Sequence, residues 1–187
     1  MSLSVYVGAP LPMFREAREV QQILRERGFT ITHDWTKGLE EGIPERLSDS
    51  EAAVIAENCI SGVENAEFSV FLFNPFVETK GTWVELGAAL GWRQHCIILL
   101  PEYYPSKGDD VNALVQMESM WLRWLHRAVF LRHAQCHRAV SHTDLHRAIE
   151  EIASSLLAKK APDNASAPLP DVAPAVAKSK AKSKRGA

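Results

Sequence analysis

The chain has 187 residues, of which 46% are hydrophobic and 24% charged, and its formal net charge is −2. This length supports one domain with a buried core, and the composition is that of an ordinary soluble protein. No run of about 18 apolar residues is present, and the start "MSLSVYVGAP" lacks a basic region followed by a long apolar one, so we expect neither a membrane span nor a secretory signal.

Segments with strand and helix patterns alternate along the chain. Short runs that are apolar or alternate in polarity predict strands, and they lie at residues 3–8, 29–35, 68–75 and 95–101. Stretches with apolar residues at helical spacing predict helices, and they lie at residues 13–28, 49–66 and 81–93. A fifth strand at residues 135–141 and a helix at residues 142–158 complete the pattern.

Capping residues support several of these boundaries. Gly28 follows the first helix, and glycine accepts the left-handed conformation in which many helices end. Ser48 or Asp49 is the expected N-cap of the second helix. Ser141-x-x-Asp144 has the pattern of a capping box at the start of the last helix.

The order of these elements predicts the arrangement of the sheet. The strand at residues 68–75 is apolar on both faces, which is typical of the centre of a parallel sheet. Strands that alternate with helices imply parallel pairing through right-handed crossovers. The sequence therefore predicts an α/β protein with a parallel sheet.

The C-terminal segment, residues 159–187, differs from the rest in composition. It is rich in Ala, Pro, Ser and Lys, and it carries a net charge of about +5 against about −7 for the remainder of the chain. Such a segment buries too little apolar surface to offset its chain entropy, so we predict a disordered basic tail. It is a candidate for weak contact with nucleic acid or an acidic partner, whereas the acidic remainder argues against nucleic-acid binding as the main task.

Polar and small residues follow three of the predicted strands at the points where the strands end. In an open parallel sheet, ligands bind outside the carboxyl ends of the strands, near the switch point. The candidate ligand-binding residues that this rule brings to one edge are Gly8, Ala9, Asp34, Trp35, Asn74, Thr79, Gly81 and Thr82. Among the aromatic residues, Trp35 is the best placed to stack on a ligand.

The stretch "KGTWVELGAAL", residues 80–90, contains a single acid, Glu85. Thr82-x-x-Glu85 matches the capping box, in which a hydroxyl and a carboxylate satisfy backbone donors at a helix start. Alternatively, Glu85 acts on a ligand, because it lies one turn into a helix that begins at the ligand-binding edge. Both interpretations fit the motif.

Motifs of several other enzyme classes are absent from the sequence. There is no G-x-x-x-x-G-K-[ST], no G-x-G-x-x-G after the first strand and no G-x-S-x-G. The three cysteines are too scattered for a disulfide framework, so we expect a reducing, cytoplasmic compartment. One metal-like group matches no standard ligand spacing, and we therefore expect neither a metal nor a cofactor; it consists of His133, Cys136, His137, His142 and His146.

Several of these segments together resemble the nucleoside 2-deoxyribosyltransferase family, which includes the related 2′-deoxynucleoside 5′-monophosphate N-glycosidases. The resemblance lies in "VYVGAP", in "FSVFLFNP" and above all in "KGTWVELGAAL" followed by "HCIILLP". The segment "VFLRHAQCHRAVSHTDLHRAI" is similar to the end of the family's fold. Under this resemblance "AVFL", residues 128–131, is not helical, and residues 111–126 are an extra helical piece.

The resemblance implies a fold and a chemistry. The fold is α/β, a flavodoxin-like or Rossmann-like three-layer sandwich with a five-stranded parallel sheet, in one domain over residues 1–158. Glu85 would be the nucleophile that attacks the anomeric carbon of the sugar, and Tyr6 in the first strand would hold it. The helix start would favour the ionised carboxylate. The expected partners are a small-molecule nucleoside or nucleotide and further copies of the chain in a homo-oligomer.

The sequence departs from the family at two aspartates that handle the base. Their positions correspond to Cys59 (or Asn58) and to Thr79, so the proton donor to the leaving base is open, with Asp34 and Glu78 as candidates. We predict an enzyme that cleaves or transfers at the N-glycosidic bond of a (2′-deoxy)nucleoside or nucleoside 5′-monophosphate. The alternative is a catalytically inactive nucleotide-binding or sensing module of the same fold.

Overall fold

A parallel sheet forms the centre of the computed structural model, which describes residues 2–39, 48–74, 77, 80–100, 129–130 and 132–160. Its five strands have the order β2-β1-β3-β4-β5, and all neighbouring pairs are parallel. The strands are β1 (Ser4–Gly8), β2 (Thr30–Ile31), β3 (Phe68–Leu72), β4 (His95–Leu99) and β5 (Cys136–Ala139). The chain goes to one side of β1 for β2 and to the other side for β3, which places the switch point between β1 and β3.

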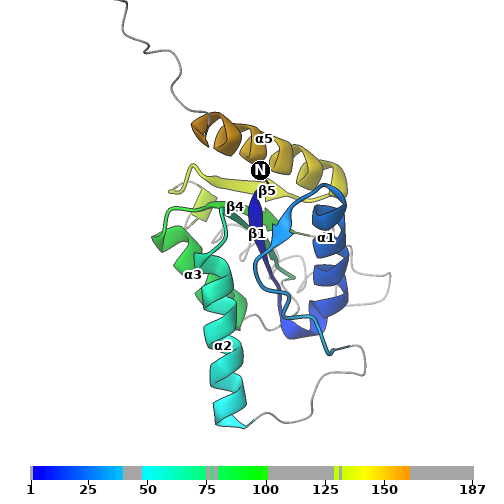
Figure 1. Cartoon of the computed structure of the whole chain (residues 1–187), viewed down its shortest axis with the longest axis vertical. Coiled ribbons are helices and arrows are strands. Elements are labelled where there is room, and N and C mark those ends of the chain that lie inside the picture. The colour runs from blue at the N-terminus through cyan, green and yellow to red at the C-terminus, as the bar shows by residue number, and fades with distance from the viewer. Residues whose placement is uncertain are drawn as a thin grey trace, which may run out of the picture.

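Helices cover both faces of the sheet (Figure 1). On one face lie α1 (Phe14–Glu26), which follows the 3-10 helix η1 (Leu11–Met13), and α5 (His142–Lys160). On the other face lie α2 (Asp49–Glu64) and α3 (Lys80–Gly91). The predicted α/β fold, a three-layer sandwich with a five-stranded parallel sheet, is confirmed.

The side chains of the strands alternate between two hydrophobic cores. Val5 and Val7 of β1 belong to the core under α1 and α5, whereas Tyr6 belongs to the core under α2 and α3. All five residues of β3 are buried, as the run of apolar residues on both faces of this strand predicts.

Local signals define the helix ends at the predicted places. The Ser48 hydroxyl accepts a hydrogen bond from the backbone N–H of Glu51 at 3.3 Å, and the Glu51 carboxylate accepts one from the Ser48 N–H at 2.8 Å. Ser48, and not Asp49, is therefore the N-cap of α2. Gly28 ends α1 with a φ of +84°, and the Ser141 hydroxyl caps α5 by accepting from the Asp144 N–H at 3.1 Å.

The strands are shorter than predicted, and three further features differ from the prediction. β2 has only two residues, because the chain turns away after Thr32 and forms a turn over residues 35–38. α5 continues to Lys160, where the lysine pairs with the Glu67 carboxylate. Val129 and Phe130 form a π-helical turn, so this part of "AVFL" is helical. Residues 101–128 and the tail from residue 161 lie outside the described residues.

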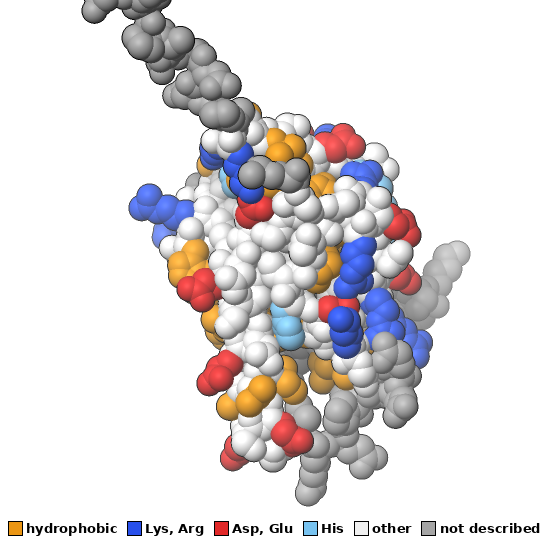
Figure 2. Space-filling model, viewed as in Figure 1, with side chains coloured by type: hydrophobic (Ala, Val, Ile, Leu, Met, Phe, Trp, Pro, Cys, Tyr) orange, Lys and Arg blue, Asp and Glu red, His pale blue; other side chains and the backbone are white. Residues whose placement is uncertain are grey.

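The N-terminal half of α2 extends beyond the sheet (Figure 1) and carries exposed hydrophobic side chains (Figure 2). Val54 and Ile55 are 55% and 45% exposed there. Because α2 runs antiparallel to the strands, this half lies at their carboxyl ends and can form a wall of a site at that edge. Within the described residues, no helix is long and apolar enough to cross a membrane.

Candidate functional site

A cleft of about 670 Å³ opens at the carboxyl ends of β1 and β2, with α2 and α3 as two of its walls. Six of the residues predicted for the site line it: Ala9, Asp34, Trp35, Gly81, Thr82 and Glu85. Segments far apart in the sequence thus converge on one cavity, at the position that the strand order predicts for a ligand.

Three predicted substrate-binding residues are not among the described residues that line the cleft: Gly8, Asn74 and Thr79. Asn74 follows β3 at the same edge, where its carbonyl oxygen accepts from the Val77 N–H at 3.1 Å. It is not among the described residues that line the cleft. Thr79 lies outside the described residues, and so does Glu78.

Gly8 makes room for the carboxylate of Glu85. A Cβ atom at position 8 would lie 2.6 Å from Glu85 Oε2 and 2.8 Å from the ring of Phe71. Both separations are shorter than packed atoms tolerate, so any larger residue would displace one of these side chains. Gly8 therefore lies behind the nucleophile candidate and not on the cleft surface, and its missing side chain allows the carboxylate to pack against β1.

Burial controls the ionisation of Glu85. Its Oε2 atom is buried and makes no hydrogen bond of normal geometry with a described residue. Burial raises the pKa of Glu85 from its ordinary 4.5 to about 7, and the neighbouring Tyr6 hydroxyl and Cys59 thiol oppose only part of this rise. The helix start does not keep the pKa of this carboxyl low, because desolvation outweighs it.

Tyr6 and Glu85 lie beside each other in the same buried space. The Tyr6 hydroxyl is buried and likewise has no hydrogen bond of normal geometry to a described residue. Burial, followed by the charge of Glu85, raises the pKa of Tyr6, so this hydroxyl stays protonated. The predicted proximity of the tyrosine and the glutamate is therefore present, with contact but without an aligned hydrogen bond.

The position of α3 decides between the two interpretations of Thr82-x-x-Glu85. The helix begins at Lys80, so Thr82 lies within its first turn and not at the N-cap that a capping box requires. The carboxylate of Glu85 lies against β1 and not at the helix start. The capping-box interpretation is therefore wrong, because the helix starts three residues earlier than an N-cap at Thr82 would place it.

The raised pKa of Glu85 predicts a pH-dependent stability. Below about pH 4.5 the carboxyl is protonated in both the folded and the unfolded chain. Between pH 4.5 and about 7 the unfolded chain releases this proton while the folded chain retains it, so the free energy of unfolding falls as pH rises. The contribution is at most about 3 kcal/mol, and the change ends once the folded chain is also ionised.

Denaturant unfolding of the wild type and of Glu85→Gln between about pH 5 and pH 8 measures this effect. The stability of the wild type relative to the variant should fall across the lower part of this range and then level off. A difference that stays constant with pH would mean that Glu85 titrates at its ordinary pKa in the folded protein.

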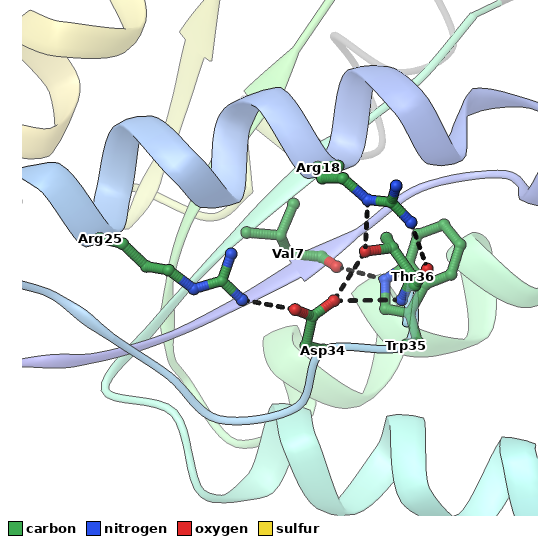
Figure 3. Close-up of polar contacts among 6 residues, drawn as sticks. All are labelled: Val7, Arg18, Arg25, Asp34, Trp35 and Thr36. Atoms are coloured by element: carbon green, nitrogen blue, oxygen red, sulfur yellow. Dashed lines mark hydrogen bonds and ion pairs between the residues drawn. The ribbon is translucent and has the colours of Figure 1, made fainter. Parts of the chain in front are cut away.

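The Asp34 carboxylate is held by side chains of the protein itself (Figure 3). Arg25 donates to Oδ2 at 2.5 Å, and Thr36 donates to Oδ1 from its hydroxyl at 2.7 Å and from its backbone N–H at 3.2 Å. Burial alone would raise the pKa of Asp34, but the hydrogen bonds from Thr36 and Arg25 and the Arg25 charge outweigh it and lower the pKa. Asp34 thus stays ionised and stabilises the turn after β2, which does not suit a proton donor.

Trp35 is a fixed part of the cleft wall. Its indole Nε1 donates to the Val7 carbonyl oxygen at 2.7 Å (Figure 3), and the ring packs against both hydrophobic cores. Thr36 follows Trp35 in the chain, and its carbonyl oxygen accepts a hydrogen bond from Arg18 at 2.6 Å. This bond connects the turn after β2 to α1. The indole is therefore held in place beside any ligand that fills the cleft.

The cleft also contains Asn58 and Cys59, one of which corresponds to a base-handling aspartate of the family, and it contains three residues that the sequence did not assign to the site, namely His33, Lys37 and Lys80. Cys59 lies beside Tyr6 and Glu85, and burial raises its pKa to about 11, so the thiol stays protonated. Positions 55, 58, 59 and 62 follow helical spacing along α2. The strand-end position of His33 was the available signal for that residue, and the stripe on α2 supports the family correspondence at Asn58 and Cys59.

A second depression, of about 800 Å³, lies along the exposed side of α1. Two of its lining residues, Arg15 and Arg18, place their guanidinium groups 5.6 and 5.7 Å from the centre of the Phe14 ring. It contains none of the predicted site residues and lies away from the strand ends. We therefore place the functional site at the smaller cleft, where Glu85 lies.

The histidine-rich segment before and within α5 is distributed over separate contacts. His137 lies 3.6 Å from the Glu151 carboxylate, and His146 contacts Arg27. Among the described residues, no three His, Cys, Asp or Glu side chains are grouped in a way that would hold a metal ion.

Comparison with known proteins adds one family assignment. The sequence model of the family described as nucleoside 2-deoxyribosyltransferase matches residues 5–118. Among solved structures, that of a CMP N-glycosidase from Clostridium botulinum aligns with 15% sequence identity and a TM-score of 0.43, covering 82% of this chain and 98% of that chain. No curated protein sequence matches significantly.

Proposed function

The chain belongs to the nucleoside 2-deoxyribosyltransferase family, and from this membership we propose that it cleaves or transfers at the N-glycosidic bond of a (2′-deoxy)nucleoside or nucleoside 5′-monophosphate. Glu85 is the nucleophile in this proposal. The observation that carries it is the place of Glu85, whose partly buried side chain is part of the wall of a cleft of about 670 Å³. A volume of this order suits a small organic ligand.

The reaction has two steps in this proposal. First, a Glu85 oxygen attacks C1′ of the sugar while the bond from C1′ to the base nitrogen breaks, and the base leaves with the bonding electron pair. The product is an ester between Glu85 and the sugar, as in retaining glycosidases. Second, water or another base attacks C1′ and releases the carboxylate. A carboxylate suits both steps, because the positive charge that develops on the sugar ring lies next to it.

Tyr6 positions the nucleophile. Its side chain is fully buried, and its ring lies 6.3 Å from the Phe71 ring and close to Gly62 of α2. A hydroxyl that is fixed in this way restricts the directions in which the Glu85 carboxylate can turn. It also keeps the pKa of Glu85 lower than burial alone would set it.

Tyr6→Phe is expected to leave the fold intact and to move the pH profile of the reaction. The Tyr6 hydroxyl makes no aligned hydrogen bond, so its removal leaves no buried polar group without a hydrogen-bond partner. Without it the pKa of Glu85 rises further above about 7, and turnover at pH 7 falls by roughly tenfold because less of the nucleophile is ionised. The rise of kcat/KM with pH checks this, and superimposable wild-type and variant profiles would contradict it.

Base release tests the proposed function directly. Deoxyribonucleosides, ribonucleosides and their 5′-monophosphates are incubated singly with the full chain, and free base is separated by chromatography. Each compound is also tested with a second base as acceptor, which distinguishes transfer from hydrolysis. Turnover of at least one compound is expected, and the absence of base release from all of them would reject the enzyme assignment.

One observation favours the alternative, a nucleotide-binding or sensing module without turnover. Asp34 is occupied by Arg25 and Thr36, and neither Cys59 nor Asn58, one of which corresponds to an aspartate under the family resemblance, carries a carboxyl group. Glu85 is thus the one carboxyl without such partners among the described residues that line the cleft. If the module binds without reacting, the same compounds raise the melting temperature and release no base.

A further inference from the structure

The second step of the proposed reaction requires a group that accepts a proton from water. Glu85 is bonded to the sugar at that stage and is not available. The Asp34 carboxylate is bound by Arg25 and Thr36. A group elsewhere in the cleft must therefore activate the water.

The remaining titratable side chains of the described cleft are one histidine, one thiol and two lysines. The Cys59 thiol keeps its proton, because burial raises its pKa to about 11. The ammonium groups of Lys37 and Lys80 carry no lone pair, so they cannot accept a proton from water. An imidazole is the side chain that accepts and returns a proton near neutral pH, which leaves His33.

His33 lies next to the residue that holds the nucleophile. It follows β2 at the carboxyl edge of the sheet and lines the same cleft as Glu85. A Cβ atom on Gly62 would lie 2.6 Å from His33 Cβ and 2.9 Å from the Tyr6 ring. The bare backbone of α2 at Gly62 thus brings His33 and Tyr6 side by side, and Tyr6 lies against Glu85.

The charges around His33 suit a group that first accepts a proton and later gives it up. Burial lowers the pKa of His33, the Asp34 carboxylate opposes this effect, and the Lys37 charge adds to it. The imidazole is therefore neutral at pH 7, and no described residue occupies its ring nitrogens with a hydrogen bond. Once it has accepted a proton, the neighbouring Asp34 carboxylate stabilises the imidazolium.

We propose that His33 is the general base that activates water for release of the sugar from Glu85. This inference rests on the proposed function and adds a catalytic residue that acts only in its second half. A neutral imidazole nitrogen takes a proton from water as the water oxygen bonds to C1′ and the bond from C1′ to Glu85 breaks.

The atoms and charges of this step balance with those of the first step. The base leaves the sugar as an anion, and the water contributes a hydroxyl group to C1′. The proton taken up by His33 is then given to the nitrogen of the departed base. The net result is one water added across the N-glycosidic bond, with Glu85 ionised and His33 neutral again, ready for another turnover.

His33→Ala separates this role from a structural one. With the compound of the substrate screen that the wild type cleaves fastest, the variant should release about one base per protein in a rapid burst. Steady turnover should then fall by about 10²- to 10⁴-fold, the range for loss of a general base. Because the second step is slowed, the sugar ester on Glu85 should accumulate and be visible by mass spectrometry of the intact protein.

Azide provides an independent readout. It is a strong nucleophile that needs no deprotonation, so it should restore turnover of His33→Ala and yield the glycosyl azide. It should not restore Glu85→Gln, which lacks the first step. His33→Gln is tested in parallel in case the alanine variant does not fold, and His142→Ala, which changes an exposed histidine outside this cleft, is the control with wild-type behaviour.

The outcomes separate the two proposals. A burst, ester accumulation and azide rescue support His33 as the base. If the folded variants keep wild-type turnover, or if the burst itself is lost and azide has no effect, His33 is not the base although the enzyme assignment stands. If the wild type releases no base from any compound, the proposed function fails, and the role of His33 fails with it.

Discussion

Glu85→Gln is expected to abolish base release while the protein stays folded. Without the nucleophile, no covalent ester forms, and turnover should fall by about a thousandfold or more, which corresponds to about 4 kcal/mol in the activation barrier. Glutamine retains the size of the side chain, so it fills the same space beside Gly8 and Tyr6. It also removes a carboxylate whose ionisation opposes folding above pH 4.5, so the melting temperature at neutral pH should be unchanged or higher.

Two measurements make this prediction specific. Thermal-shift titration with a nucleoside or nucleotide should show that Glu85→Gln still binds the ligand. A 2-fluoro-substituted nucleoside, which destabilises the oxocarbenium-like state and slows the second step, should leave a sugar adduct on Glu85 of the wild type. Peptide mapping by mass spectrometry locates the adduct.

Gly91→Ala is a suitable control for effects on α3 itself. This position is at the end of the same helix, and an added Cβ would meet no atom within 4 Å. The control should retain wild-type turnover and stability. Full activity of Glu85→Gln, or an adduct on another residue, would show that the carboxylate of Glu85 is not the nucleophile.

Gly8→Ala is expected to impair both stability and turnover. The new methyl group would lie 2.6 Å from Glu85 Oε2 and 2.8 Å from the Phe71 ring. Phe71 is fully buried and cannot move aside easily, so the carboxylate must shift. Overpacking of this kind lowers the free energy of unfolding by about 1–3 kcal/mol. A nucleophile displaced by about 1 Å slows the reaction by about a hundredfold.

The losses of stability and of turnover in Gly8→Ala, measured together, show whether displacement of the Glu85 carboxylate causes both. Denaturant unfolding gives the loss of stability, and the rate of base release under conditions where the variant is fully folded gives the loss of activity. The double variant Gly8→Ala with Glu85→Gln should be no slower than Glu85→Gln alone, because both changes act on the same group. A folded Gly8→Ala protein with wild-type turnover would mean that the carboxylate does not need its place against β1.

The sequence alone determined the layered architecture, because the signals for it are local. Apolar runs such as residues 68–72 predict buried strands wherever they occur in a chain, since burial on two faces requires apolar side chains on both. The caps at Gly28, Ser48 and Ser141 depend on contacts within a few residues, so they were recognisable without the fold. The length of β2 was not recognisable from the sequence, because the turn that follows this strand is held by hydrogen bonds from Arg18 and Arg25 of α1, which lie outside the strand pattern itself.

The sequence also pointed to Glu85, but only the tertiary structure showed its surroundings. Thr82-x-x-Glu85 fits a helix cap as well as a site, and the decision came from where α3 begins and from the bare backbone of Gly8 on a distant strand. The same holds for two neighbouring residues: Asp34 forms an ion pair with Arg25 of α1, and His33 meets Tyr6 across Gly62 of α2. The physical reason is that a pKa depends on desolvation and on the charges packed around a group. Residues brought together by the fold, and not by their order in the chain, supply both.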